Sequence, residues 1–200
     1  MDLSVDAIKK QIPYYLTEGD KKALVNELKK FNAINYYINL YPDIALQGDG
    51  WSALGLIRYE TRERRQVRGI ILSNSCDIDP KNKRDIPAKL LFAPIIKLRA
   101  FASLLKDADI PKEKIDDKFN SIRQQGVTTL FYLPKGAGLE DEYIALLDDI
   151  HSLPLKVFFE QKDRTKLFTL SLPGFYLFIL KLSLHFCRFS EEDVSRTKAI

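Results

Sequence analysis

The sequence is poor in cysteine, with only Cys76 and Cys187 among its 200 residues. The two lie far apart in the chain and show no Cys-x-x-Cys spacing. Disulfide scaffolds and zinc ribbons need several closely spaced cysteines, so both classes are excluded. Neither cross-link is needed for stability, because a domain of this length buries roughly 70% of its unfolded surface.

Long hydrophobic runs are missing as well. The most apolar stretch, residues 175–180, is followed closely by Lys181 and His185. A membrane-spanning helix needs about 20 consecutive apolar residues, so this stretch predicts a buried helix. The first residues lack the basic and apolar regions of a secretory signal peptide. We therefore expect a cytoplasmic protein with no membrane contact.

The sequence also has little excess of one charge. It contains 31 Lys and Arg against 27 Asp and Glu, a net charge of +4, which by itself does not indicate a nucleic-acid-binding protein. Residues 58–84 hold eight basic and four acidic side chains, so their surplus equals that of the whole chain. The basic ones are Arg58, Arg62, Arg64, Arg65, Arg68, Lys81, Lys83 and Arg84. This segment is the best candidate for contact with a polyanion.

Helical periodicity predicts an N-terminal helical segment over residues 1–46. Tyr36, Tyr37 and Tyr41 lie near its end. Aromatic side chains can stack on nucleic-acid bases. The plainer interpretation is a linker that packs on the following domain, and we favour it because an aromatic pattern alone is a weak signal of base stacking.

Short apolar runs bounded by turn residues replace this periodicity after residue 47. Seven of them predict strands, at residues 51–59, 67–73, 89–98, 127–133, 142–147, 155–159 and 166–170. Helices do not alternate regularly with these runs, so we expect an α+β protein with a small antiparallel β-barrel over residues 47–170. A helical insertion at residues 99–125, broken at Pro111, interrupts the barrel, and C-terminal helices follow over residues 171–200.

The first C-terminal helix is expected to begin after Ser171, with Pro173 in its first turn. This helix is apolar nearly all round, so it must be covered on most sides. The barrel, the N-terminal helices or another subunit could provide that cover. We expect a protein partner or a homodimer through this helix.

A hairpin between the runs at 51–59 and 67–73 would place residues 60–66 in its loop. Four arginines would then crowd one end of the barrel: Arg62, Arg64, Arg65 and Arg68. Guanidinium groups match the geometry of phosphate and stack on bases. The alternative is a solvated loop whose charges serve solubility only.

A dense polar cluster follows the second of these strands: Ser73, Asn74, Ser75, Cys76, Asp77 and Asp79. Cys76 could act as a nucleophile and Asp77 as a general acid or base. In the structural alternative, Asn and Asp end the strand in a turn and the cysteine is packed. Residue type alone favours the turn, while the position next to the arginine-rich segment keeps the catalytic interpretation open.

Motifs of nucleotide-binding loops, zinc proteases and α/β-hydrolases do not occur in the sequence. The two histidines are His151 and His185. His185 and Cys187 are two positions apart on a predicted helix and point to different faces, so they make a poor metal pair. We expect each histidine to be a partly buried structural residue, and we expect no cofactor and no metal.

Several short segments together form a recognisable pattern: the Gly-Asp turn at 47–49, the strand at 68–73, the Ala-Pro-Ile strand at 92–95, and the stretches at 133–134 and 143–153. In this order they resemble the MazF/PemK-like toxins, small SH3-like barrels that cleave RNA. The run Leu-Ser-Asn-Ser-Cys-Asp-Ile at 72–78 is also similar to a Ser-x-x-Cys-Asp signature in uncharacterised prokaryotic and phage proteins with this barrel.

In the family, an arginine at the start of the second strand and a Thr or Ser after Ala-Pro-Ile cleave RNA. Arg68 matches the arginine to within about one residue, whereas Ile96 stands where the hydroxyl would be. The resemblance implies a toxin-like or phage-defence-associated module that contacts RNA or another nucleic acid. As a divergent metal-independent endoribonuclease, it would use Arg68, Ser73, Cys76 and Asp77 in catalysis. The residues expected to bind the nucleic acid are Arg62, Arg64, Arg65 and Asn74. The alternative is a non-catalytic protein-interaction module of a larger toxin–antitoxin or defence complex.

Overall fold

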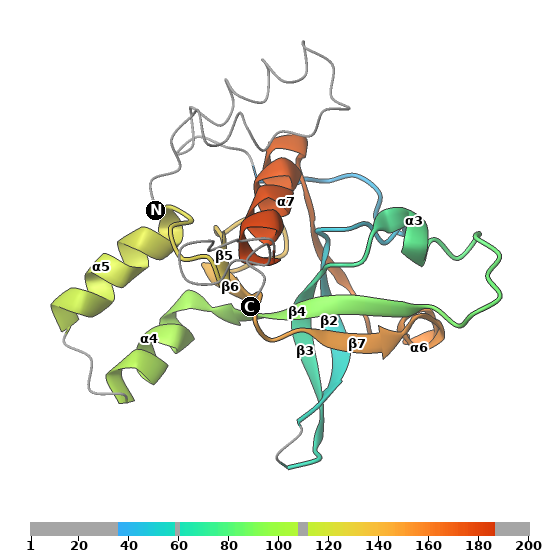
Figure 1. Ribbon diagram of the computed structural model, residues 1–200, viewed down its shortest axis with the longest axis horizontal. Coiled ribbons are helices and arrows are strands. Elements are labelled where there is room, and N and C mark those ends of the chain that lie inside the picture. The colour runs from blue at the N-terminus through green and yellow to red at the C-terminus, as the bar shows by residue number, and fades with distance from the viewer. Residues whose placement is uncertain (1–35, 59–60, 108–111, 187–200) are drawn as a thin grey trace, which may run out of the picture.

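The computed structural model describes residues 36–58, 61–107 and 112–186. They form an α+β protein built on one curled antiparallel sheet, a half-barrel, with helices packed around it (Figure 1). The expected α+β class and the expected antiparallel pairing are confirmed, with a half-barrel sheet in place of a barrel. The N-terminal helical segment was expected over residues 1–46. Its residues 1–35, and the part of the C-terminal segment after residue 186, lie outside the described residues. At 36–46 the structure has the short strand Tyr37–Ile38 and turns instead of a helix, because the backbone there pairs with Thr169 and Leu170.

The sheet contains eight strands in the order β1-β8-β2-β3-β4-β6-β5, and β7 pairs with β4 beside this path. The strands are β1 (Tyr37–Ile38), β2 (Gly50–Ile57), β3 (Arg64–Ile71), β4 (Lys89–Lys97), β5 (Leu130–Leu133), β6 (Tyr143–Leu146), β7 (His151–Pro154) and β8 (Lys166–Leu170). All of their pairings are antiparallel. The pairs β2–β3 and β5–β6 form hairpins, as an antiparallel sheet permits, whereas helices lie in the connections from β3 to β4, from β4 to β5 and from β7 to β8.

The longest strand, β4, organises the half-barrel. Its first half pairs with β7 and its last three residues pair with β6, while β3 pairs with its middle. Gly69 of β3 lies opposite Pro94 of β4. A β-carbon at Gly69 would lie 2.8 Å from the side chains of Leu54 and Phe92, so only glycine allows this close approach.

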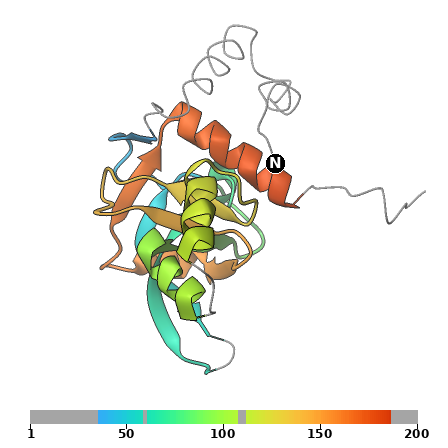
Figure 2. The same ribbon diagram turned by 90° about the vertical axis from the view of Figure 1, so that its left-hand side faces the viewer.

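The helices are α3 (Ser75–Ile78), α4 (Leu98–Asp107), α5 (Lys112–Arg123), α6 (Leu155–Glu160) and α7 (Leu172–Phe186). None of these described helices is both long and apolar enough to cross a membrane. Helix α7 lies across the top of the half-barrel, and α4 and α5 lie side by side against β5 and β6 (Figure 2). The helical insertion expected at residues 99–125 is therefore confirmed.

Buried apolar side chains form clusters on both faces of the sheet. Leu177 and Phe178 of α7 pack with Ile70 of β3 and Phe131 of β5 on one face. The other face carries a second cluster that includes Trp51 and is covered by α3 and α6. Burying such large apolar side chains supplies most of the stability of the fold.

Helix α7 begins where the sequence predicted. The hydroxyl oxygen of Ser171 accepts a hydrogen bond from the backbone N–H of Gly174 at 3.2 Å, which caps the helix. Leu177, Phe178 and Lys181 are buried, whereas Leu172 and Phe186 near its two ends are exposed. The half-barrel thus provides one of the covers expected for this apolar helix.

The run at residues 155–159 was predicted to be a strand, and this prediction is wrong. The strand lies just before it, in β7, and Leu155–Glu160 forms α6. Leu155 and Phe158 are buried at a spacing of three, which is a helical period. A five-residue apolar run is too short to show whether its period is two or three, so the sequence pattern alone did not separate the alternatives.

The tyrosines near residue 40 mainly pack on the domain, as the linker interpretation expects. Tyr36 is buried, and the ring of Tyr37 packs against Phe168 of β8 at a centroid distance of 5.1 Å. The backbone at Tyr37 pairs with Leu170, which makes β1 the outermost strand. Tyr41 is half exposed.

Candidate nucleic-acid interface

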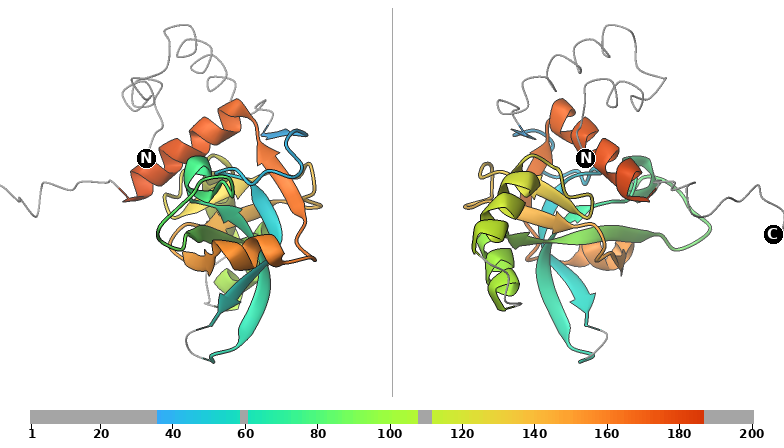
Figure 3. Two further views of the ribbon diagram at one scale, coloured as in Figure 1. Left: turned by 90° about the vertical axis from the view of Figure 1, so that its right-hand side faces the viewer. Right: turned by 60° about the vertical axis from the view of Figure 1, so that its left-hand side comes forward.

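Strands β2 and β3 extend beyond the rest of the sheet as a two-stranded hairpin (Figures 1 and 3). The predicted hairpin is confirmed, but its loop spans residues 58–63 rather than 60–66. The N–H of Arg58 donates to the oxygen of Glu63 at 3.0 Å, and the N–H of Arg62 donates to the oxygen of Arg58 at 2.8 Å. Arg62 takes a φ of 57°, the left-handed conformation of a tight turn.

Four arginine side chains of this hairpin are exposed: Arg58, Arg62, Arg64 and Arg65. Within the described part of the chain, their one carboxylate partner is Glu63, whose Oε2 lies 3.5 Å from Nη2 of Arg65. Both side chains of that pair are more than half exposed, so the pair is weak. The hairpin therefore presents several guanidinium groups to solvent, and such groups bind phosphate oxygens.

Arg68, in the middle of β3, has different surroundings. Its Nη1 donates to Oε1 and Oε2 of Glu140 at 3.1 and 2.9 Å, and it also donates to the hydroxyl oxygen of Tyr143. The guanidinium carbon lies 5.5 Å from the centre of the Tyr143 ring, in a cation–π contact. Nζ of Lys97 lies 2.9 Å from Oε1 of Glu140. Arg68 thus belongs to a cluster of four polar residues, which we call the Glu140 cluster.

Hydrogen bonds within the Glu140 cluster shift two pKa values. The bond from the Tyr143 hydroxyl, 2.7 Å long, is the main cause that holds the pKa of Glu140 well below its usual range, with Lys97 the next cause. Burial, together with the bond to Glu140, raises the pKa of Tyr143 to about 12. At neutral pH the carboxylate is therefore ionised and the tyrosine is neutral.

The two acidic residues after Glu140 also form ion pairs. Asp141 pairs with Arg99 of α4 at 3.0 Å. Glu142 accepts hydrogen bonds at 2.8 Å from Nε and Nη2 of Arg123, and a third at 2.6 Å from the hydroxyl of Tyr132. This acidic tripeptide therefore connects β3, β4, α4 and α5.

Sequence reasoning missed Lys97, Glu140 and Tyr143 as partners of Arg68. The acidic tripeptide at 140–142 was visible in the sequence as a charge run. Its partners come from other strands and helices that are far away in the chain, so no local spacing could have identified them.

The position matched to the catalytic hydroxyl of the resembled family does not join Arg68. Ile96 is partly buried and packs with Leu98 and Ile144 in the cluster beneath α4 and α5. Successive residues of a strand face opposite sides of the sheet, so Lys97 rather than Ile96 shares a face with Arg68. A hydroxyl at position 96 would therefore point away from the Glu140 cluster.

The polar cluster after β3 is used mainly for local structure. The hydroxyl oxygen of Ser73 accepts from the N–H of Leu91 at 2.8 Å. The side chain of Asn74 caps α3 by accepting from the N–H of Cys76 at 2.9 Å. The side chains of Cys76 and Asp77 are exposed. Turn and capping geometry, the structural alternative, thus accounts for Ser73 and Asn74.

The structure does not bring this polar cluster and the hairpin arginines together. Arg64 lies at the beginning of β3, while Ser73 and Asn74 follow its end. The eight residues of β3 span about 25 Å of extended chain, so the two groups lie at opposite ends of the strand. The closeness in sequence that kept the catalytic interpretation open therefore does not bring the two groups together in space, because residues along one strand are separated by its length.

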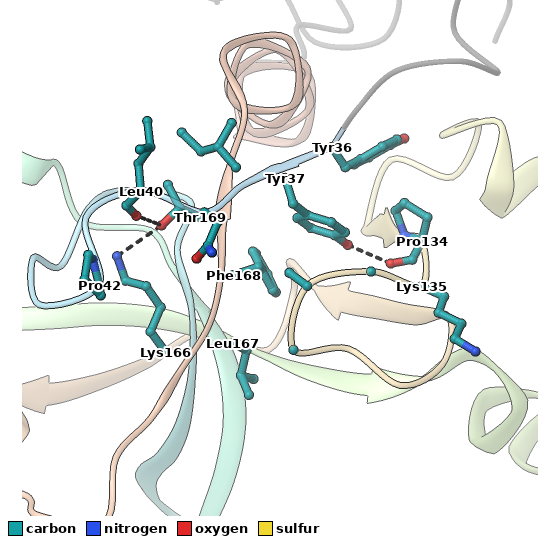
Figure 4. Close-up of a pocket in the computed structure, with 15 residues that line it drawn as sticks. Tyr36, Tyr37, Leu40, Pro42, Pro134, Lys135, Lys166, Leu167, Phe168 and Thr169 are labelled. Atoms are coloured by element: carbon teal, nitrogen blue, oxygen red, sulfur yellow. Dashed lines mark hydrogen bonds between the residues drawn. The ribbon is translucent and has the colours of Figure 1, made fainter.

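A cavity of about 760 Å³ opens between β1, β8 and the turn at 134–138 (Figure 4). The hydroxyl of Tyr37 closes one side by donating to the backbone oxygen of Pro134 at 2.8 Å. On the opposite side, Nζ of Lys166 donates to the hydroxyl of Thr169 at 3.1 Å. None of the predicted catalytic or nucleic-acid-binding residues lines this cavity.

Two further observations bear on the site. Among the described residues, no three His, Cys, Asp or Glu side chains come together in a group that could hold a metal ion. Comparison of the chain with protein-family models and with curated protein sequences gives no match. Function must therefore be inferred from the geometry.

Proposed function

We propose that the chain is a divergent MazF/PemK-like module, with an SH3-like barrel, that contacts RNA through the β2–β3 hairpin. Its role would be toxin-like or associated with phage defence. The observation that supports RNA contact is the group of four exposed arginines on a hairpin that extends from the sheet. A two-stranded ribbon with outward guanidinium groups can follow the phosphates of a nucleic acid.

The hairpin supports binding more strongly than the polar cluster supports catalysis. Among the described residues, Arg65 has only one weak carboxylate partner, whereas Arg68 is held by Glu140 and Tyr143. Cys76 and Asp77 lie at the far end of β3 from the hairpin loop. We therefore propose nucleic-acid binding as the primary activity and RNA cleavage as a further step that needs Arg68.

RNA binding by the purified full-length chain tests the proposal. A labelled single-stranded RNA of about 20 nucleotides is titrated with the wild type and with Arg62→Ala/Arg64→Ala/Arg65→Ala, and anisotropy reports the affinity. We expect the variant to bind roughly tenfold or more weakly, because phosphate contacts supply most of the affinity. Equal affinities of the two proteins would overturn the role of the hairpin.

A matched control removes the same amount of charge elsewhere. Lys81, Lys83 and Lys89 are exposed and lie away from the hairpin loop. Their triple alanine variant should retain most of the affinity. The same RNA incubated with wild type in EDTA tests metal-independent cleavage, and cleavage that survives Arg68→Ala would exclude the proposed catalytic arginine.

The second candidate function is a non-catalytic protein-interaction module. It is favoured by Ile96, which is apolar and packs beneath α4 and α5 where the family has a catalytic hydroxyl. A partner or a second copy would dock on the domain, with α7 as the expected contact. Light scattering of the full-length chain measures the mass in solution, and a monomer that recovers no partner from its native cells would count against this function.

A further inference from the structure

We propose that Arg68, Lys97 and Tyr143 form a phosphate-binding site, and that the carboxylate of Glu140 occupies this site as an internal competitor. The proposal rests on the proposed function, because the phosphate is taken to belong to the nucleic acid that the hairpin contacts. It adds a second contact, away from the hairpin loop, whose strength depends on the position of Glu140.

Strand pairing builds the site. Lys97 of β4 lies directly opposite Tyr143 of β6, and the register Gly69↔Pro94 places Arg68 of β3 on the neighbouring strand. Three adjacent strands thus present one donor each at the same end of one face. Because the donors stand on a paired sheet rather than on loops, their relative positions are fixed before any ligand arrives.

The donors are only partly used by Glu140. Arg68 contacts the carboxylate through Nη1 alone, and its Nε and Nη2 have no hydrogen-bond partner within the described part of the chain. Lys97 contacts it once, through a single ion pair. A phosphate group has more acceptor oxygens than a carboxylate and would engage these remaining donors.

The nearby pair of Arg123 and Glu142 shows a carboxylate that is bound by two nitrogens of one guanidinium group. Glu142 receives two parallel hydrogen bonds from Nε and Nη2 of Arg123 and a third from Tyr132. Glu140 lacks this two-nitrogen geometry, and its side chain is half exposed. Exposed ion pairs contribute little to stability, so Glu140 can leave its partners at small cost, whereas Glu142 has a structural role.

The charges in the Glu140 cluster also support the role of Glu140 as a competitor of phosphate. Glu140 neutralises one of the two cations beside it, and its negative charge repels an incoming phosphate. Its pKa is held well below the usual range by Tyr143 and Lys97, so the carboxylate stays ionised at neutral pH. Glu140→Gln keeps the shape of the side chain and removes the repulsion.

The test compares Glu140→Gln with Asp141→Asn, which removes one charge from the adjacent residue and leaves the three donors untouched. The single-stranded RNA used for the hairpin forms one arm, and inorganic phosphate forms the other. We expect Glu140→Gln to bind RNA about fivefold more tightly than wild type or Asp141→Asn, the effect of one repulsive charge at short range. Adding Arg68→Ala to Glu140→Gln should abolish the gain.

Nuclear magnetic resonance of the Arg68 side chain locates the ligand. In Glu140→Gln, addition of either probe should shift the Nε–H signal of Arg68. A shift with inorganic phosphate but no gain for RNA would still support the site and assign it to a small phosphate compound. Equal RNA affinities of Glu140→Gln and Asp141→Asn, with no shift of Arg68 by either probe, would overturn it.

Two controls distinguish a failure of the phosphate site from an unfolded variant and from a failure of the proposed function. Thermal unfolding of each variant shows whether it is folded, and Glu140→Ala provides a second variant if Glu140→Gln is unstable. The hairpin variant Arg62→Ala/Arg64→Ala/Arg65→Ala tests the proposed function independently, since these residues lie outside the Glu140 cluster. If the hairpin variant weakens binding while Glu140→Gln neither strengthens it nor shows a shift of Arg68 with either probe, the function stands and the phosphate site is wrong.

Discussion

Nζ of Lys166 lies 2.7 Å from Oδ2 of Asp49, whose side chain is completely buried. Burial raises the pKa of the Asp49 carboxyl, and the hydrogen bond from Lys166 acts against this effect. Lys166 also donates to the backbone oxygens of Tyr41 and Ile44 at 2.7 and 2.6 Å. The pair therefore ties the segment before β2 to β8. The turn at 47–49, one of the segments that resemble the MazF/PemK-like family, has a structural role in this chain.

Replacing Asp49 should destabilise the fold strongly. Asp49→Asn keeps the size of the side chain but leaves the charge of Lys166 without its partner, a loss that typically costs about 3 to 5 kcal/mol. Urea denaturation should show a decrease of about 3 kcal/mol in the free energy of unfolding. Asp43→Asn, at an exposed position nearby, should change it by less than about 0.5 kcal/mol. A similar small change in both variants would contradict the structural role of the pair.

A second buried cation, Lys181 of α7, predicts a pH dependence of stability. Its Nζ donates to the backbone oxygen of Gln125, and burial lowers its pKa from 10.5 to about 8. Between these values the unfolded chain binds more protons than the folded protein, so stability rises with pH. Lys181 by itself contributes a gain of about 2 kcal/mol between pH 8 and pH 10, and this contribution is the difference between wild type and a variant that lacks the lysine.

The variant Lys181→Met should lose this rise in stability. Lys156→Met, at an exposed site on α6, should retain it. Urea denaturation of both variants and of wild type at pH 8, 9 and 10 measures the slopes. Measurements should stop near pH 10, because buried tyrosines with raised pKa values, such as Tyr36 and Tyr37, increasingly oppose the rise as the pH approaches and passes 10, in wild type and variants alike. Parallel slopes for wild type and Lys181→Met would exclude Lys181 as the cause.

Much of the sheet could be predicted because its strands are bounded by local signals. The run at 89–98 corresponds to β4, the run at 166–170 to β8, and Pro111 separates α4 from α5. Periodicity and turn residues act over a few positions, and the sequence contains them directly. The strand pairing at 51–59 and 67–73 also followed from adjacent runs with a short connection.

The candidate site was less predictable because its contacts are tertiary. Arg68 was identified, but its partner Glu140 lies 72 positions further along the chain. The polar cluster in the sequence suggested a catalytic role for Ser73 and a binding role for Asn74. In the structure, their side chains accept hydrogen bonds from backbone N–H groups. Composition shows which groups are present, and only the fold shows which of them meet.

Substitutions in the polar cluster should separate the capping residue from the thiol. Asn74→Ala removes the acceptor for the N–H of Cys76 and should lower the free energy of unfolding by about 1 kcal/mol, the usual effect of a lost helix cap. Cys76→Ser, at an exposed site, should change it by less than about 0.5 kcal/mol. Urea denaturation measures both. A larger loss for Cys76→Ser would show that the thiol is packed after all.

The salt dependence of RNA binding should report how many hairpin arginines contact phosphates. For single-stranded nucleic acids, each neutralised phosphate contributes about −0.7 to the slope of log K against log salt concentration. Arg62→Ala/Arg64→Ala/Arg65→Ala should therefore make the slope less negative by about 2, as measured by anisotropy over a series of salt concentrations. Lys81→Ala/Lys83→Ala/Lys89→Ala removes the same charge and should leave the slope nearly unchanged. If both variants changed the slope equally, net charge rather than the hairpin would govern binding, because the counterions released would not depend on where the cations stand.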